Sequence, residues 1–221
     1  MTCELILPCR DEAGALVDLL PRVPDAFSVI VVDNGSTDGT ADVARRLGAR
    51  VVHEPLPGYG AAVHAGLLAA GAEFVAVMDG DGSLDPDDLL PLLDAVASGR
   101  ASMAVGRRRP TGRGVWPWHA RLGNRLVLAW LRRRLAGDAG LAVRDIAPIR
   151  VCRRTDLLAL DVRDRRFGYP VELLQKASRA GWRIVEQDVG YHARARGTRS
   201  KVSGSVVGTA RTARDFWRVL A

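Results

Sequence analysis

Two aspartates one residue apart, Asp79 and Asp81, follow an apolar segment and precede Ser83. If that segment is a strand, both carboxylates can point into one site, and hard oxygen ligands of this type suit Mg²⁺ or Mn²⁺ bound to a diphosphate. Such an ion would neutralise a departing nucleoside diphosphate. A plain turn followed by a helix capped by Asp85 would use the same residues. The spacing favours the metal site over the turn.

A second polar turn, residues 33–40, follows another apolar segment and contains Asp33, Asn34 and Gly35. Its carboxylate and amide could read the edge of a nucleobase, and its glycines let the backbone approach a ligand. The alternative is a tight turn followed by a helix cap. Taken alone, this turn leaves both interpretations open.

The elements around these turns predict that the polar residues meet. Strands are expected at residues 3–7, 28–32, 50–53, 73–78 and 101–105. Helices are expected at 13–20, at 60–70 and between the 33–39 turn and residue 47. Strands that alternate with helices of this length favour an α/β fold with a mostly parallel central sheet flanked by helices. Because ligands of such sheets bind beyond the carboxyl ends of the strands, the clusters at 8–12, 33–38 and 79–88 should converge.

The second half of the chain is strongly basic. A basic loop is expected at 107–117, strands at 150–153 and 183–187, and helices at 119–135 and 167–180. Residues 1–100 contain 6 Arg and 16 Asp or Glu (−10), whereas residues 101–221 contain 26 Lys or Arg and 9 Asp or Glu (+17). The acidic half suits a metal ion, and the basic half suits phosphates, nucleic acid or an anionic membrane.

Length and apolar content indicate one globular domain without a linker. No apolar run approaches the about 20 residues that span a bilayer, and the N-terminus lacks a signal-peptide pattern, which favours a cytoplasmic protein. Cys3, Cys9 and Cys152 have no metal-site spacing, so reduced thiols in or near the core are expected.

Four short motifs follow one another along the chain: LPCRDE at 7–12, VDNGSTDGT at 32–40, GYGAA at 58–62 and MDGD at 78–81. Together they resemble the glycosyltransferase family 2 enzymes and, within them, the dolichol-phosphate mannose synthase-like group, which uses polyprenyl phosphate acceptors. The resemblance covers nearly the whole chain and implies a Rossmann-like, A-type glycosyltransferase fold that binds a nucleotide sugar. It divides the single domain 1–221 into a donor- and metal-binding half, 1–105, and an acceptor-binding half, 106–221.

The resemblance also implies roles for individual residues. The metal, Mg²⁺ or Mn²⁺, would be held by Asp79, Asp81 and Ser83. The implied donor-binding residues are Pro8, Arg10, Glu12, Asp33, Gly35, Gly60 and Asp79. Two positions depart from the pattern: Ser83 stands where relatives often carry Gln or another polar residue, and Asn34 replaces a frequent second Asp. The base and the sugar of the donor stay open.

Three basic or polar segments, 144–150, 168–172 and 194–201, resemble the acceptor- and phosphate-contacting segments of the same group. The implied contacts are Arg107, Arg150, Glu172, Arg196, Arg199, Ser200 and Lys201. Arg and Lys in a Gly-containing loop bind phosphate oxygens through charge-assisted hydrogen bonds. A solvated basic loop would have the same composition.

The relatives are inverting enzymes, in which the acceptor attacks the anomeric carbon while the nucleoside diphosphate departs. A phosphate acceptor, with a second pKa near about 6, needs little help from a general base. A hydroxyl acceptor would need one, and Asp145 is the candidate, with the alternative that it only orients Arg150 or a neighbouring loop. Asp81 and Asp145 are therefore the predicted catalytic residues.

Two helical segments could contact a membrane. In 119–135, Arg121, Arg125 and Arg132 fall together beside a broad apolar arc, and 204–220 has a similar pattern. Apolar arcs flanked by arginine and tryptophan suit an interfacial helix on anionic lipid. Packing against the sheet or a second subunit would give the same pattern, which leaves the oligomeric state open.

The leading hypothesis is transfer of a sugar from a nucleotide-diphosphate sugar to a polyprenyl phosphate at the cytoplasmic membrane face. The nearest alternative is a soluble acceptor. A nucleotidyltransferase is a further alternative. It is disfavoured because such enzymes usually have a Gly-rich basic loop after the first strand, whereas residues 8–12 of this chain contain two acidic residues and no glycine. A nucleic-acid partner is not expected, because the few aromatic residues are not interleaved with the arginines as a stacking platform.

Overall fold

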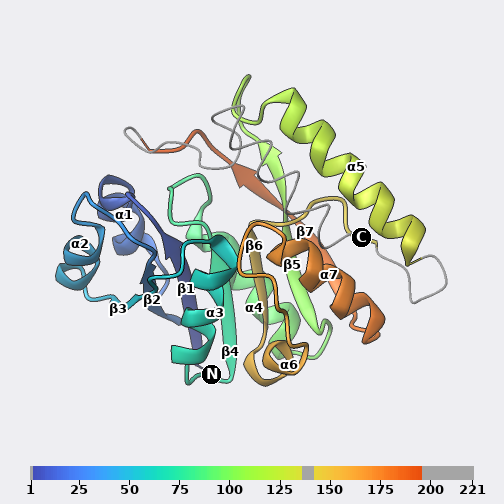
Figure 1. The fold of residues 1–221 in the computed structure, drawn as a ribbon, viewed down its shortest axis with the longest axis horizontal. Coiled ribbons are helices and arrows are strands. Elements are labelled where there is room, and N and C mark those ends of the chain that lie inside the picture. Colours follow the sequence, from blue (N-terminus) through green and yellow to red (C-terminus); the bar gives the residue numbers. More distant parts are fainter. Residues whose placement is uncertain (1, 136–141, 196–221) are drawn as a thin grey trace.

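The computed structural model describes residues 2–135 and 142–195, which form a seven-stranded sheet between two layers of helices (Figure 1). The strands are β1 (Cys3–Cys9), β2 (Phe27–Asp33), β3 (Arg50–His53), β4 (Phe74–Met78), β5 (Met103–Pro110), β6 (Ile149–Arg153) and β7 (Ile184–Tyr191). The helices are α1 (Ala13–Leu19), α2 (Thr40–Arg46), α3 (Tyr59–Ala69), α4 (Leu89–Ala97), α5 (Trp118–Arg134), α6 (Arg154–Ala159) and α7 (Tyr169–Arg179). Short 3₁₀ helices cover Leu20–Arg22 and Pro86–Asp88.

The sheet has the order β3-β2-β1-β4-β6-β5-β7. The first four of these strands run parallel, β6 lies antiparallel between β4 and β5, and β7 runs parallel to β5. The predicted mostly parallel α/β sheet is confirmed. Cys9 pairs with Asp33, and Ile6 pairs with Val77. The turns after β1, β2 and β4 therefore leave the sheet along one edge.

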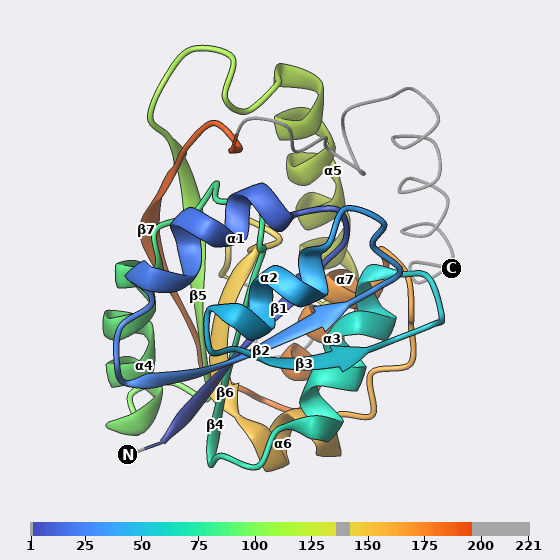
Figure 2. The same cartoon turned by 90° about the vertical axis from the view of Figure 1, so that its left-hand side faces the viewer.

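The two faces of the sheet carry separate cores. Helices α1, α2 and α4 cover one face, and α3, α5, α6 and α7 cover the other, as the views in Figures 1 and 2 show. In β1, Leu5 and Leu7 belong to the first core and Ile6 to the second, because successive side chains of a strand point to opposite faces. All of β4 is buried, as expected of a parallel strand covered on both sides.

All seven predicted strands are present, and two local predictions are wrong. β5 continues to Pro110, so the first residues of the predicted 107–117 loop lie in the sheet. They pair in parallel with β7, from Arg107 opposite Asp188 to Pro110 opposite Tyr191, and these backbone hydrogen bonds outweigh the polar, loop-like composition. Helix α6 has no counterpart among the predicted elements.

The three cysteines are buried and free, as expected. Across residues 2–135 and 142–195, none of the helices has the length and apolar character that a membrane span requires.

Candidate active site

The turn after β1 is hydrogen-bonded to the turn after β2. The backbone N of Asp11 donates to Ser36 Oγ at 3.0 Å, and that of Glu12 donates to Thr40 Oγ1 at 2.9 Å. In return, the backbone N of Thr37 donates to Asp11 Oδ1 at 2.8 Å. The short polar side chains of these turns thus fix the position of Glu12 relative to the end of β2.

Asp33, the last residue of β2, is 8% exposed and is held from two sides. Its Oδ1 accepts a hydrogen bond from the backbone N of Ser36 at 3.0 Å, and its Oδ2 lies 3.2 Å from His53 Nδ1. Arg45 Nη2 lies 2.6 Å from the other ring nitrogen, Nε2. Because a guanidinium only donates, Nε2 accepts, and the hydrogen of a neutral His53 is on Nδ1, where it faces Asp33.

Asn34 bridges three backbone groups of the segment that precedes α3. Its Nδ2 donates to the carbonyls of Glu54 and Leu56, both at 2.8 Å, and its Oδ1 accepts from the backbone N of Gly58 at 2.8 Å. An aspartate could not donate to either carbonyl. The departure from the resembled motif therefore has a structural reason: Asn34 ties residues 54–58 to the β2 turn.

The turn formed by Asp79, Gly80 and Asp81 packs directly against the turn after β1. A Cβ atom on Gly80 would lie 2.5 Å from Cys9 Sγ and 3.0 Å from Glu12 Oε2, so this approach requires glycine. The turn that carries the two aspartates is thus in contact with the β1 turn, which is itself bonded to the β2 turn. The three polar clusters meet at one edge of the sheet, as the alternation of strands and helices predicts.

The two aspartates share a strongly charged environment. Asp81 is 6% exposed and accepts hydrogen bonds from the backbone N of Ser83 at 3.0 Å and from Arg194 Nε. For Asp79, which is only partly exposed, burial and then the adjacent charge of Asp81 raise the pKa to about 6, against the opposing effect of three nearby arginines. A proton or a cation at Asp79 is therefore favoured.

These residues fit a divalent metal ion that also binds a diphosphate. Bound Mg²⁺ or Mn²⁺ would relieve the repulsion between Asp79 and Asp81, and Mg²⁺ usually takes only one or two carboxylates plus water and phosphate oxygens. Ser83 Oγ is buried and has no hydrogen-bond partner within the described chain, so an unsatisfied oxygen lies next to the pair. No group of three or more His, Cys, Asp and Glu side chains that could hold a metal occurs in residues 2–135 and 142–195.

Asp145 is fully buried and pairs with Arg108 rather than with Arg150. The backbone N and Nε of Arg108 donate to Asp145 Oδ2 at 2.9 and 2.8 Å, and Nη2 donates to Oδ1 at 2.6 Å. Burial alone would lower the pKa of Arg108, but the hydrogen bonds and charge of Asp145 outweigh it and raise that pKa. The guanidinium also lies 4.2 Å from the centre of the Trp116 ring. This geometry favours a positioning role for Asp145 over the predicted general base.

Arg150, in β6, is 3% exposed. Its Nη2 donates to Tyr59 Oη at 2.9 Å, and its Nε is buried without a hydrogen-bond partner among the described residues. Its charge acts on Asp79 and opposes the rise of that pKa. Arg150 is therefore a buried cation near the aspartates, and the phosphate contact predicted for it stays a prediction.

Gly60 of α3 and Glu172 of α7 both contact residues 163–166. A Cβ atom on Gly60 would lie 2.3 Å from the carbonyl oxygen of Asp164. Glu172 Oε2 accepts from the backbone N of Asp164 at 2.6 Å, and Oε1 lies 3.1 Å from Lys176 Nζ. The structure gives both residues a structural role, and the ligand contacts predicted for them remain predictions.

The other predicted site residues are spread over the molecule. Pro8 lies in β1, Arg10 is exposed in the turn that follows, and Gly35 has a φ of 78°, a left-handed conformation that favours glycine. Arg107 lies on β5 beside a basic cavity. Arg196, Arg199, Ser200 and Lys201, like the helical pattern at 204–220, lie outside the described residues.

Reasoning from the sequence missed three contacts of the site, although Arg194 lies in the segment 194–201 that it singled out. Arg194 reaches Asp81 across 113 positions and Arg108 reaches Asp145 across 37, so neither pair leaves a local spacing. His53 did leave a signal in the sequence, because it is the last residue of the predicted strand 50–53. In the structure it pairs with Asp33, the last residue of β2.

Comparison with known proteins identifies one family whose sequence profile matches this chain. Residues 5–157 match the sequence profile of Glycosyl transferase family 2. The chain is 51% identical over 217 residues to an uncharacterized glycosyltransferase of Mycobacterium tuberculosis, with 98% of this chain and 97% of the relative covered. It is 34% identical over 230 residues to the undecaprenyl-phosphate mannosyltransferase of Micrococcus luteus, with 93% and 89% covered. It is 33% identical over 220 residues to the polyprenol monophosphomannose synthase of Mycolicibacterium smegmatis, with 91% and 81% covered.

Among solved structures, glucosyl-3-phosphoglycerate synthase from Mycobacterium tuberculosis in complex with Mg²⁺ and UDP has the same fold. The TM-score is 0.78 at 23% identity, and the alignment covers 99% of this chain and 78% of the other. A complex of that enzyme with Mn²⁺, UDP and phosphoglyceric acid gives a TM-score of 0.75 at 25% identity, with 99% and 77% covered.

Proposed function

Because the chain belongs to glycosyl transferase family 2, we propose that it transfers a sugar from a nucleotide-diphosphate sugar to a polyprenyl phosphate at the cytoplasmic face of a membrane, with a divalent metal ion. The observation that carries this proposal is the meeting of Asp33, Glu12 and the Asp79–Asp81 turn at one edge of the sheet. Such an edge can hold the nucleoside at one end and the metal-bound diphosphate at the other.

On the donor side, Asp33 and Glu12 would contact the nucleoside, with His53 keeping the Asp33 carboxylate in place. Asp79 and Asp81 would hold the metal ion, which supplies positive charge for the diphosphate oxygens. Arg194 pairs with Asp81, and its positive charge would stabilise the negative charge of a diphosphate that departs from a metal ion bound there. The donor would thus be bound by carboxylates through a metal ion and by arginine directly.

On the acceptor side, a phosphate oxygen would attack the anomeric carbon and form the new bond as the bond from that carbon to the diphosphate breaks. An ionised phosphate has no proton to lose, so no general base is required. This chemistry agrees with the state of Asp145, whose carboxylate is saturated by Arg108.

A lipid acceptor is supported by the outer surface of α5. Trp118, Leu122 and Leu126 follow one another at intervals of four residues and are 75%, 46% and 62% exposed. A tryptophan and two leucines in line on a helix rich in arginine are typical of an interfacial helix. The names of the Micrococcus and Mycolicibacterium relatives point to the same acceptor class. The alternative is a soluble phosphorylated acceptor, favoured by the structural match to a complex that contains phosphoglyceric acid.

The test combines Mn²⁺ and a panel of radiolabelled nucleotide sugars with either undecaprenyl phosphate in detergent or 3-phosphoglycerate. We expect label to move into the organic phase only with the lipid phosphate. Label that stays in the aqueous phase as a new phosphorylated product would favour the soluble acceptor. No transfer from any donor to either acceptor, despite Mn²⁺-dependent binding of a nucleoside diphosphate, would contradict both acceptor classes.

A further inference from the structure

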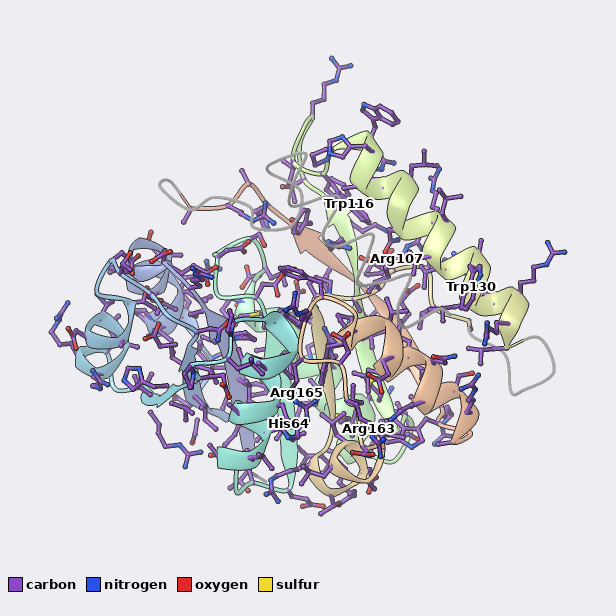
Figure 3. All side chains as sticks on the ribbon, in the orientation of Figure 1. His64, Arg107, Trp116, Trp130, Arg163 and Arg165 are labelled. Atoms are coloured by element: carbon purple, nitrogen blue, oxygen red, sulfur yellow. The ribbon has the colours of Figure 1, made fainter. Side chains whose placement is uncertain are left out.

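A cavity of about 450 Å³ is lined by residues of β5, of α5 and of the stretch that precedes β6. Four of its six lining residues are arginines: Arg107 of β5, Arg125 and Arg132 of α5, and Arg144. Figure 3 shows Arg107 on the side of the sheet that faces α5. Leu128 of α5, buried in the core, contributes to the wall. Guanidinium groups from three separate segments therefore face one space.

The carboxylates near these arginines have other partners: Glu186 accepts from the backbone N of Arg144 at 2.6 Å and from that of Asp145 at 3.0 Å. Asp188 lies 3.8 Å from Arg107 but only 2.8 Å from Arg109, outside the larger cavity. Arg132 donates to the carbonyl of Val143. In the part of the chain that the structure describes, the side chains of Arg125 and Arg144 have no carboxylate partner. A concave surface with one sign of charge concentrates counter-ions, so this cavity attracts anions.

We infer that this cavity binds the phosphate group of an anionic ligand, at a site separate from Asp79 and Asp81. Guanidinium groups match phosphate oxygens through paired, charge-assisted hydrogen bonds. The volume lies within the roughly 300–1,000 Å³ range of small-molecule sites and exceeds what a lone phosphate needs. Neither aspartate lines the cavity, so the anion held there is not the diphosphate that the aspartates would bind through a metal.

The surroundings of the cavity suggest a ligand that is also apolar. Successive residues of a helix are about 100° apart, so Arg121, Arg125 and Arg132 lie between the exposed Trp118–Leu122–Leu126 line and the buried face of α5. A phosphate in the cavity would thus be next to exposed apolar side chains. This is the arrangement expected for the headgroup of a lipid whose hydrocarbon part lies against α5.

The cavity adjoins a second cavity that is lined by residues of the candidate active site. A smaller cavity of about 130 Å³ shares Arg107, Arg125 and Arg144 with the larger one and is lined further by Arg108 and Asp145. A phosphate-bearing ligand in the larger cavity would therefore lie beside the cavity that Arg108 and Asp145 line, and the charge of Arg108 acts on Asp79. The inference does not require the proposed transfer reaction, because the site would bind phosphate in either case.

The test is a binding experiment on the full chain. R125Q/R144Q removes two cavity arginines that have no carboxylate partner among the described residues, and R46Q/R133Q removes the same charge from exposed positions that line neither cavity. Calorimetry would measure inorganic phosphate, and co-sedimentation would measure binding to phosphatidylcholine vesicles with and without phosphatidylglycerol. Thermal melting and Mn²⁺-dependent binding of nucleoside diphosphates would be measured in parallel.

We expect R125Q/R144Q to weaken anion binding about tenfold or more, while R46Q/R133Q and the nucleoside diphosphate affinity stay near wild type. Loss confined to phosphatidylglycerol vesicles would identify a lipid headgroup, and loss of inorganic phosphate binding as well would identify a site open to free phosphate. Equal binding by wild type and R125Q/R144Q, or an equal loss in R46Q/R133Q, would overturn the inference. Loss of nucleoside diphosphate binding in a folded R125Q/R144Q protein would do so too, because the arginines would then belong to the donor site.

Discussion

Arg108 holds both carboxylate oxygens of Asp145, through its backbone N, its Nε and its Nη2. The aspartate has no solvent exposure, and the arginine is stacked at 4.2 Å on Trp116. Both oxygens of the carboxylate are therefore occupied within a buried ion pair, and removing one partner of such a pair is costly. The pair fixes the position of a buried guanidinium whose charge acts on Asp79.

Asp145→Asn should therefore act mainly on stability. Removing one partner of a buried ion pair leaves an uncompensated charge, so we expect a loss of about 3 kcal/mol in the free energy of unfolding, measured by urea denaturation. With a phosphate acceptor, the pH profile of kcat below neutrality should keep its shape. Disappearance of an ionisation from that profile, with normal stability, would instead indicate that Asp145 is a general base.

Asp81→Asn should abolish transfer while the fold is kept. The neutral amide is a weak metal ligand, and loss of a metal-bound diphosphate removes several kcal/mol of transition-state stabilisation, so kcat/KM should fall by about a hundredfold or more. The affinity for a nucleoside diphosphate should become insensitive to Mn²⁺, as measured by calorimetry. Asp87→Asn, at an exposed position of the following 3₁₀ helix, is the control. Full activity in Asp81→Asn would refute the role of this residue.

Metal-dependent donor binding should weaken at acidic pH. The pKa of Asp79 is raised to about 6, and a metal ligand must be deprotonated, so protons compete with the metal ion below that pH. Mn²⁺-dependent affinity for a nucleoside diphosphate should be constant above about pH 7 and fall as the pH drops through 6. Calorimetry in buffers of different ionisation enthalpy should detect proton release at pH 6. Affinity independent of pH from 5 to 7 would contradict this prediction.

The raised pKa of Asp79 has the opposite effect on the stability of the metal-free protein, to which this group contributes more at acidic pH. Between the ordinary pKa of an aspartate and about pH 6, Asp79 keeps its proton in the folded state and has already lost it in the unfolded chain. The contribution of this group to stability should therefore decrease as the pH rises through that window, and Mn²⁺ should restore it. Urea denaturation with and without Mn²⁺ at pH 5 and pH 7 gives the comparison.

Substitution of His53 should affect donor binding more than turnover. His53→Val removes the hydrogen bond to Asp33, whereas His53→Asn keeps an N–H group near the place of Nδ1. We expect KM for the nucleotide sugar to rise by about three- to tenfold in His53→Val, with kcat little changed, and to recover at least in part in His53→Asn. An equal fall in kcat for both variants would show that His53 does more than position Asp33.

The edge where the polar turns meet could be predicted from the sequence because it depends on strand order and strand ends. Buried parallel strands are visible as short apolar runs, and Asp33 and Asp79 follow two of them directly. The pairing of Arg194 with Asp81 could not be predicted, because one arginine among 30 carries no mark of which carboxylate it reaches. The structural role of Asn34 could not be predicted either, since its three backbone partners become neighbours only after folding. Gly60 was assigned to the donor because a small residue in a motif gives no sign of whether a ligand or another part of the chain needs the space.

The antiparallel direction of β6 has a consequence for how the two halves of the chain cooperate. Ile149, at the beginning of β6, pairs with Met78, at the end of β4. Arg150, the second residue of β6, therefore lies near the edge of the sheet where Asp79 and Asp81 follow β4. The reversed direction of β6 thus brings an arginine of the basic half of the chain beside the aspartates of the acidic half, and a ligand at this edge would be close to both signs of charge.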